Sequence, residues 1–312
     1  MAAYAAALVA AEAAPAAIGA GRTLPGTVNA AIVSYLSSAV FAALAPDTRG
    51  PRRRILERFR LEHGDKRVAL LQRTHIDRMV AAKAGTPGVA RNFLSAIRAV
   101  MGHCVALGWR ADDPTAGVKR PALKSGGIRT WPEPDIAAFE AQHPIGSRAR
   151  LAFALLLYTA QRRSDVIRLG RQHVRDGLLL LRQQKTGATL AIPVHPALAE
   201  ILSATPSDNL TFLTAAAGQP FTPEGFTNWF RKMCNEAGLP PGTSAHGLRK
   251  AACRRLAEAG CSANVIAAIS GHASLREVQR YTAAADQARM ARSAIDSMVT
   301  AFPTRRTRPH PG

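Results

Sequence analysis

Apolar residues recur at three- and four-residue steps through the first part of the chain, which is the period of amphipathic helices. Four segments show this period, joined by short links rich in Gly, Pro and Asp. They cover residues 27–44, 52–64, 67–85 and 87–109. Each has one apolar face to bury, so the pattern predicts a compact bundle of about four helices.

The period changes in the second half. Helical spacing over about 133–143 and 147–159 precedes residues 173–194, where apolar runs are broken by Asp-Gly and Lys-Thr-Gly. Such turns between apolar runs predict three strands in a small antiparallel sheet. Helical spacing then resumes to about Phe302. The expected fold class is mainly α, with a helical first domain and a mixed α+β second domain.

The later helices begin with recognisable capping residues. Thr222 stands before Pro223, and Ser244 stands before a helical stretch that ends near residue 260. Ser274 and Glu277 have the spacing of a capping box. Three aromatic residues share one face of a single helix and are expected in the core, not on a base-stacking platform: Phe226, Trp229 and Phe230.

A stretch rich in Pro, Gly and basic residues separates the two regions and predicts an exposed linker. Two domains are the expectation for 312 residues, with one globular unit as the alternative. The predicted parts are an Ala-rich N-terminal tail, a helical domain, the linker, the mixed α+β domain and a basic C-terminal tail. Their bounds are 1–24, 25–120, 121–131, 132–302 and 303–312.

The charge balance favours a polyanionic partner. Lys and Arg number 41 against 21 Asp and Glu, for a net charge of +20. The excess is spread along the chain, which indicates a long footprint on nucleic acid. A basic composition with no nucleic-acid role is the alternative. The DNA-binding candidates are Arg52, Arg53, Arg91, Lys119 and Arg120.

Several classes of protein and site are disfavoured. No apolar run of about 18 residues could span a membrane, and the Ala-rich start lacks the basic region of a signal peptide. The four cysteines form no C-x-x-C pair, so we expect reduced cytoplasmic thiols and no zinc site. There is no P-loop or H-E-x-x-H motif. The triplets KTG and SDN stand in reversed order without Ser-x-x-Lys and are read as chance matches.

What remains is a set of cations and a tyrosine in the second region. His246 and Arg249 lie three positions apart at a helix start, so they share a face near its positive end. With a second arginine, a lysine, a second histidine and Tyr281, they form a set that has no acidic cluster for a metal. Such a set suits metal-free attack on a phosphodiester, with the tyrosine as nucleophile and the cations offsetting charge on the non-bridging oxygens.

At these residues the chain resembles the tyrosine recombinase, or phage integrase, family. The family signature is an arginine in a Thr-Gly-x-Arg-x-Ser-Glu-like stretch, a hairpin lysine, His-x-x-Arg, Gly-His and a tyrosine nine residues further on. The matching motifs, in order over about 120 residues, are TAQRRSD (159–165), QKTG (184–187), HGLR (246–249), GH (271–272) and Tyr281. The helical first region is similar in pattern to the family's core-binding domain, which contacts DNA.

Two positions depart from the family pattern. Ala160 stands where the family usually has glycine, and Arg163 directly follows Arg162. A one-residue slip would therefore exchange the arginine that faces the phosphate. The offsets from Thr159 and Ser164 favour Arg162. Neither departure removes a catalytic group, so an active enzyme is expected.

The resemblance implies a role for each matched residue. Tyr281 would attack the scissile phosphate, leaving a 3′-phosphotyrosyl link and a free 5′-hydroxyl. Arg162 and Arg249 would bind the non-bridging oxygens, and Lys185 would protonate the departing 5′-oxygen. The remaining groups would be His246 as acid/base partner of the tyrosine, His272 as a further donor, and Asp165, which would orient Arg162 or His246.

The implied function is site-specific recombination of duplex DNA, integrating or excising a mobile element, with no cofactor. The resemblance also implies a tetrameric synaptic complex, and an accessory directionality factor is possible. The expected location is the bacterial cytoplasm, on the nucleoid. Two alternatives stay open: a type IB topoisomerase-like nicking-closing enzyme, and a non-catalytic DNA-binding regulator.

Overall fold

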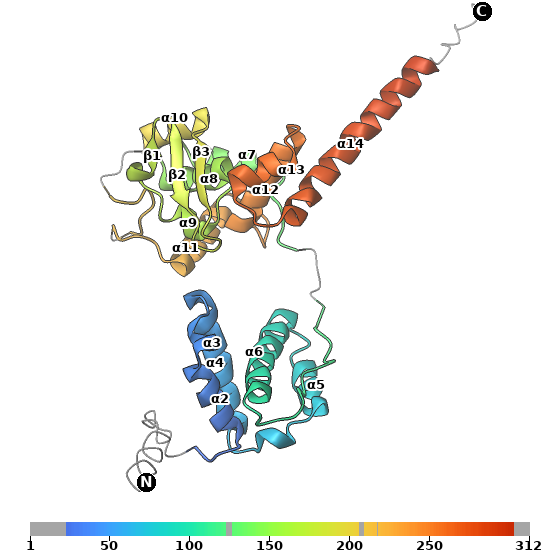
Figure 1. Cartoon of the computed structure of the whole chain (residues 1–312). Coiled ribbons are helices and arrows are strands. Elements are labelled where there is room, and N and C mark those ends of the chain that lie inside the picture. Colours follow the sequence, from blue (N-terminus) through green and yellow to red (C-terminus); the bar gives the residue numbers. More distant parts are fainter. Residues whose placement is uncertain (1–22, 123–126, 206–208, 217, 303–312) are drawn as a thin grey trace, which may run out of the picture. The chain divides into compact units, whose positions relative to one another are not determined.

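The computed structural model describes residues 23–122, 127–205, 209–216 and 218–302 (Figure 1). They fall into two compact units, divided between residues 125 and 126. Most of the predicted N-terminal tail, the C-terminal tail and part of the predicted linker lie outside the described residues. No helix in the described ranges is long and apolar enough to cross a membrane.

The first unit is built of helices, as the spacing predicts. The predicted helix over 27–44 is divided at Ser38, whose extended backbone ends one helix and whose hydroxyl accepts from Phe41 N in the next. The predicted helix over 67–85 begins only at Arg73, because Leu71 and Gln72 are extended. The elements are α2 (Val28–Ser37), α3 (Ala39–Ala42), α4 (Pro46–His63), the 3₁₀ turn η2 (Val68–Leu70), α5 (Arg73–Ala81) and α6 (Pro87–Ala106).

One apolar core holds the first unit together. It lies between α2, α4 and α6, and α5 packs on α6 (Figure 1). Leu56, Ile76 and Ile97 are fully buried, one from each of α4, α5 and α6. Burying such side chains contributes roughly 1.5–3 kcal/mol each. The helical periodicity therefore marks the faces that pack.

The second unit combines helices with a small sheet, in agreement with the predicted fold class. Its first elements are α7 (Glu133–Gln142), α8 (Arg148–Thr159), α9 (Arg163–Val166), the 3₁₀ turn η3 (Arg171–His173), β1 (Val174–Arg175), β2 (Leu178–Arg182) and β3 (Thr189–Pro193). The later ones are α10 (Pro196–Ala204), α11 (Pro223–Glu236), α12 (Ala245–Glu258), α13 (Ala263–Ser270) and α14 (Leu275–Ala301). Helix α8 is apolar on nearly all sides and packs between α10 and α12 (Figure 1).

The sheet has the order β1-β2-β3 with antiparallel neighbours. Asp176 and Gly177 both have positive φ, 52° and 74°, as a two-residue hairpin turn between twisted strands requires. Leu179 pairs with Ile192, and both are buried on the core face. The β2–β3 hairpin therefore has a fixed register and a fixed tip.

The end of the predicted linker belongs to the second core. Trp131, predicted in an exposed segment, is fully buried, and its indole N–H donates to Ser244 O at 3.0 Å. A side chain on Gly247 would place its Cβ only 2.1 Å from Arg129 O, so only glycine permits this approach. Tertiary packing of an aromatic side chain overrides the local Pro/Gly signal here. The start of α12 is consequently fixed on this segment.

Other local predictions differ in detail. Phe226 and Phe230 are buried as expected, but Trp229 is only partly buried and lies 5.1 Å from the Arg148 guanidinium. Ser274 does cap α14, but its side chain makes no capping hydrogen bond, so the predicted capping box is absent. Glu277 instead extends toward His272, 3.8 Å away.

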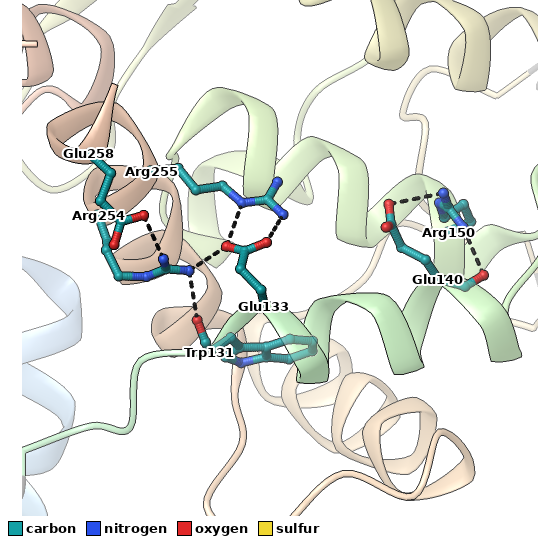
Figure 2. A network of polar contacts seen from close by, with 7 residues as sticks. All are labelled: Trp131, Glu133, Glu140, Arg150, Arg254, Arg255 and Glu258. Atoms are coloured by element: carbon teal, nitrogen blue, oxygen red, sulfur yellow. Dashed lines mark hydrogen bonds and ion pairs between the residues drawn. The ribbon is translucent and has the colours of Figure 1, made fainter. Parts of the chain in front are cut away.

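An ion-pair network holds α12 to the start of α7 (Figure 2). Glu133 accepts from Arg254 at 2.6 Å and from Arg255 at 2.5 and 3.0 Å. Arg254 also donates to Glu258 at 2.7 Å and to Trp131 O at 3.3 Å. Hydrogen bonding from Arg255, followed by that from Arg254, lowers the pKa of Glu133 from 4.5 to about 2.

Glu133→Gln is expected to lower the free energy of unfolding at pH 7 by up to about 1 kcal/mol, because the carboxylate is half exposed and screened. A depressed pKa stabilises the fold above pH 4.5 and loses that effect as the pH falls toward 2. Urea unfolding of the full chain at pH 7 and pH 3 measures this. Glu258→Gln, which removes only the Arg254 contact, is the control. An equal loss for Glu133→Gln at both pH values would contradict the prediction.

Candidate active site

Helix α12 places His246 and Arg249 on one face. Ser244 caps the helix by accepting from Gly247 N at 3.3 Å. Arg249 is only 2% exposed, and its Nη1 donates to Ala160 O at 2.6 Å. Burial lowers the pKa of Arg249 to about 10, with the charge of Arg162 as the second cause, so the guanidinium stays protonated at neutral pH. A buried cation is thus held at the start of a helix.

Ala160 ends α8 in the left-handed region, with φ 53°. A glycine takes this conformation without strain, which accounts for the family's preference at the position. Alanine is accommodated here with its carbonyl turned to Arg249. The departure from the family pattern therefore leaves the backbone acceptor in place.

The two neighbouring arginines point to different partners. Arg162, the N-cap of α9, donates from Nη1 to Gln183 Oε1 at 2.9 Å. Arg163 is exposed and donates to Thr227 Oγ1 on α11. Both line the same hollow. Only Arg162 is tied to the hairpin that carries Lys185.

That hollow, of about 420 Å³, brings together residues from separate segments of the second unit. No Asp or Glu of the described chain lines it. Burial lowers the pKa of His246 below 6.5, and the charges of Arg249 and Lys250 are the next causes. A histidine that is neutral at pH 7 can accept a proton. The basic residues that line the hollow are Arg162, Arg163, Lys185, Arg231, His246 and Arg249.

His272 supports the hollow from the side of α13. Its Nε2 lies 3.2 Å from Arg249 Nη2, and its Nδ1 lies 2.6 Å from Ser270 Oγ. Since an arginine only donates, Nε2 accepts and Nδ1 carries the proton. Burial, then the charge of Arg249, lowers the pKa of His272 to about 4, so the ring is neutral. In this arrangement His272 orients Arg249.

Tyr281 lies on the second turn of α14 and does not line the basic hollow. Its ring packs on the core of the unit and lines a neighbouring hollow of about 1230 Å³ with Arg254 of α12 and Arg280. Burial raises the pKa of Tyr281 to about 12, with the nearby Cys253 as the second cause. The phenol is therefore protonated at neutral pH in this position.

Asp165 is buried and stabilises the lysine hairpin. Its Oδ1 accepts from Gln184 N at 2.9 Å, while Oδ2 is buried without a hydrogen-bond partner among the described residues. Among the described residues its carboxylate makes no hydrogen bond to the side chain of Arg162 or of His246, the two groups that the resemblance suggested it orients. Its contact fixes the backbone directly before Lys185.

The sequence reasoning missed the amides around Arg162. Gln161 and Gln183 are both buried and bonded to each other. A glutamine next to Arg162 and another two positions before Lys185 are the only local signals. Arg231, on α11, was also not singled out, because one arginine on an amphipathic helix is ordinary surface charge.

The DNA-binding candidates all lie in the first unit. Arg52 and Arg53 are on α4, where Arg52 donates to Tyr35 Oη at 2.9 Å and Arg53 lies over the Phe41 ring. Arg91 is on α6. Lys119 and Arg120 follow the last helix of this unit and are exposed. In the described residues, no three His, Cys, Asp or Glu side chains gather to hold a metal ion.

Comparison with known proteins places the chain among integrases. The phage integrase family matches residues 133–288. The integrase of Escherichia phage HK022 is 26% identical over 67% of this chain, and the chain spans 60% of that protein. The tyrosine recombinase XerC of Erythrobacter litoralis is 26% identical over 81% of this chain and 87% of its own length.

Solved structures share the fold at lower identity. A lambda integrase dimer bound to a COC′ core site has a TM-score of 0.72 at 19% identity, covering 82% of this chain and 77% of that one. The Tn1549 transposon integrase with a circular intermediate DNA has a TM-score of 0.68 at 15% identity, covering 85% and 99%. These likenesses confirm the predicted fold class. With the family match over the whole active-site region, the chain belongs to the phage integrase family, as the resemblance predicted.

Proposed function

We propose that this chain is a site-specific DNA recombinase that cuts and rejoins duplex DNA through a 3′-phosphotyrosyl intermediate on Tyr281. One observation carries the proposal: the hollow gathers cations from α9, the β2–β3 hairpin and α12 with no carboxylate, beside the helix of Tyr281. A site of this charge suits a phosphodiester. The relatives named above are integrases and recombinases, which does not favour a topoisomerase or a non-catalytic regulator.

In the proposed cleavage step each of these groups takes the role that the family resemblance implies. Arg162 and Arg249 bind the non-bridging oxygens of the scissile phosphate and offset the charge that develops there. The Tyr281 oxygen forms a bond to phosphorus as the bond to the 5′-oxygen breaks. His246 takes the phenol proton, and Lys185 gives a proton to the 5′-oxygen. The 5′-hydroxyl of another strand then attacks the phosphotyrosine and reverses these steps.

For this attack the Tyr281 oxygen has to reach the phosphate that the cations bind. Its ring lines the hollow between α12 and α14, whereas the cations proposed to bind phosphate line the basic hollow. Its raised pKa reflects burial where it now lies. The charge of Arg249 lowers the pKa of Tyr281 and partly opposes this rise. We therefore propose that Tyr281 changes from this protected position to a reactive one before it attacks.

Assembly and biological task extend the proposal. The distal part of α14 exposes Ile295, Met298, Val299 and Phe302, each more than half exposed and spaced along one side. We propose that this side packs on a second copy in a tetramer that holds two DNA sites; a lambda integrase tetramer bound to a Holliday junction has the same fold. Counting protein copies on a four-way DNA junction by native mass spectrometry tests this. The task proposed is integration or excision of a mobile element on nucleoid DNA in the bacterial cytoplasm, with an accessory directionality factor as a further proposed partner.

The test of the function is covalent trapping. The full chain is incubated with nicked duplexes from the flanks of its own gene, in EDTA and without ATP, and a denaturant-resistant protein–DNA adduct is sought. The proposal expects an adduct whose DNA-linked peptide contains Tyr281. The proposal would be overturned if DNA binds but no duplex from either flank forms an adduct, or if the adduct forms on another residue. Exchange of strands between two sites, compared with relaxation of one, separates recombinase from topoisomerase.

Lys185→Ala is expected to slow single-turnover cleavage by about a hundredfold, because it removes the acid that protonates the leaving oxygen. A substrate with sulfur at the 5′-bridging position should be cleaved at nearly the wild-type rate, since a thiolate leaves without a proton. Lys250→Ala is the control: Lys250 bonds to Ile128 O and does not line the hollow. Equal slowing of Lys185→Ala on both substrates would show that Lys185 is not the acid.

A further inference from the structure

Gln183 lies at the centre of the site without reaching its surface. The residue is 1% exposed and directly follows β2, just before the tip of the β2–β3 hairpin. Its Oε1 accepts from Arg162 Nη1 at 2.9 Å and from Thr186 Oγ1 at 2.6 Å. Its Nε2 donates to Gln161 Oε1 at 2.6 Å and to Ser270 O at 2.8 Å. All of the hydrogen-bonding capacity of the amide is thus used. The bonds to Gln161 and Ser270 O are buried, and those from Arg162 and Thr186 are partly buried.

The polarity of these partners selects an amide. Arg162 can only donate and the Ser270 carbonyl can only accept, so the oxygen and the nitrogen of the amide each have one possible orientation. A carboxylate would face two acceptors, and an apolar side chain would leave four groups unpaired. An amide also accepts from Arg162 without cancelling its charge. That charge remains for a phosphate.

Gln183 joins three segments that each carry a site residue. These are the α8–α9 turn with Arg162, the hairpin with Lys185, and the α13–α14 turn with His272. Gln161 adds a second tie, because its Nε2 donates to Ile269 O at 2.8 Å. Gly271 has φ 66°, and a Cβ there would lie 2.4 Å from Gln183 Nε2. The approach of the last turn to Gln183 therefore depends on this glycine.

We propose that Gln183 is a positioning residue for strand cleavage: it sets the guanidinium plane of Arg162 and ties the Lys185 hairpin to the turn that precedes the helix of Tyr281. The inference rests on the proposed function, since it concerns the rate of the same reaction. A guanidinium recognises phosphate through a planar fork, so fixing one nitrogen fixes the direction of the others. Loss of this contact leaves the charge of the site intact and its geometry loose.

The experiment measures single-turnover cleavage of nicked DNA at saturating protein, with the DNA dissociation constant and thermal midpoint for each variant. Gln183→Met keeps the volume and loses the hydrogen bonds, and Gln184→Met makes the same change at the neighbouring exposed side chain. The expected result for Gln183→Met is a rate about ten- to a hundredfold lower with the dissociation constant within about twofold. Gln184→Met should cleave as the wild type does.

A second background separates positioning from a merely structural role. If Gln183 acts through Arg162, then Gln183→Met should slow cleavage by less than about threefold in an Arg162→Lys protein, which has no fork to orient. A structural role alone would slow both backgrounds by the same factor, and that result would overturn the inference. So would a wild-type rate for Gln183→Met.

Gln183→Glu is a second test, which does not depend on whether the Gln183→Met protein folds. It keeps the shape and an acceptor for Arg162, but its charge pairs with Arg162 and competes with phosphate, so cleavage should fall tenfold or more. A wild-type rate for this variant also contradicts the inference. If the wild type itself forms no adduct, the proposed function fails; if it does and the Gln183 variants match it, only the present inference fails.

Discussion

Tyr281→Phe is expected to abolish the covalent DNA adduct while leaving the DNA dissociation constant within about twofold of the wild type. The substitution removes only the phenol oxygen, which is the nucleophile in the proposed step. It leaves in place the cations of the basic hollow and of the first unit, which are the proposed source of the affinity for phosphate. Binding and chemistry should therefore separate completely in this variant.

A gel that retains adducts through denaturant, run beside a binding titration, measures both quantities. Tyr158→Phe is the matched control, because Tyr158 is also a partly buried tyrosine of the second unit. Its ring stacks on His195, the N-cap of α10, and lines neither hollow. It should form the adduct as the wild type does. An adduct with Tyr281→Phe would move the nucleophile to another residue and remove the basis of the proposed mechanism.

Local pattern predicted the elements because each depends on neighbours in sequence. Asp176-Gly177 makes the hairpin turn, Ser244 caps α12, and Gly271 ends α13 in the left-handed region, all from residue types whose backbone preferences are strong. The family motifs then indicated which segments carry the chemistry. Their order and spacing hold across about 120 residues. A single short motif would have been weak evidence.

Side-chain direction was not predictable in the same way. Two predictions failed because a tertiary contact decided them: Trp131 is buried against α12, and Glu277 extends toward His272 without closing a capping box on Ser274. The amide of Gln183 was missed for the same reason, since three of its four partners come from outside its own hairpin. The separation of Tyr281 from the cations likewise depends on how α14 packs on α12.

Arg249→Ala is expected to lower the cleavage rate by a hundredfold or more, up to about a thousandfold, because it removes a preorganised donor from the transition state. The loss has a structural component as well. Arg249 is buried and donates to Ala160 O and toward His272 Nε2, so both acceptors lose their partner. We expect the free energy of unfolding to fall by about 1–3 kcal/mol. Single-turnover cleavage at saturating protein removes any effect on DNA affinity from the comparison.

Two variants and one titration separate the catalytic loss from the structural one. Arg255→Ala also removes an arginine of α12, but one that pairs with Glu133 outside the hollow, so its cleavage rate should stay near that of the wild type. Arg249→Lys keeps the charge without the fork and should cleave at an intermediate rate. In Arg249→Ala the pKa of His272 should rise from about 4, because the second cause of its depression is gone, yet stay below 6.5 because burial remains the first. Near-normal cleavage together with that rise would mean that Arg249 orients His272 and does not stabilise the reacting phosphate.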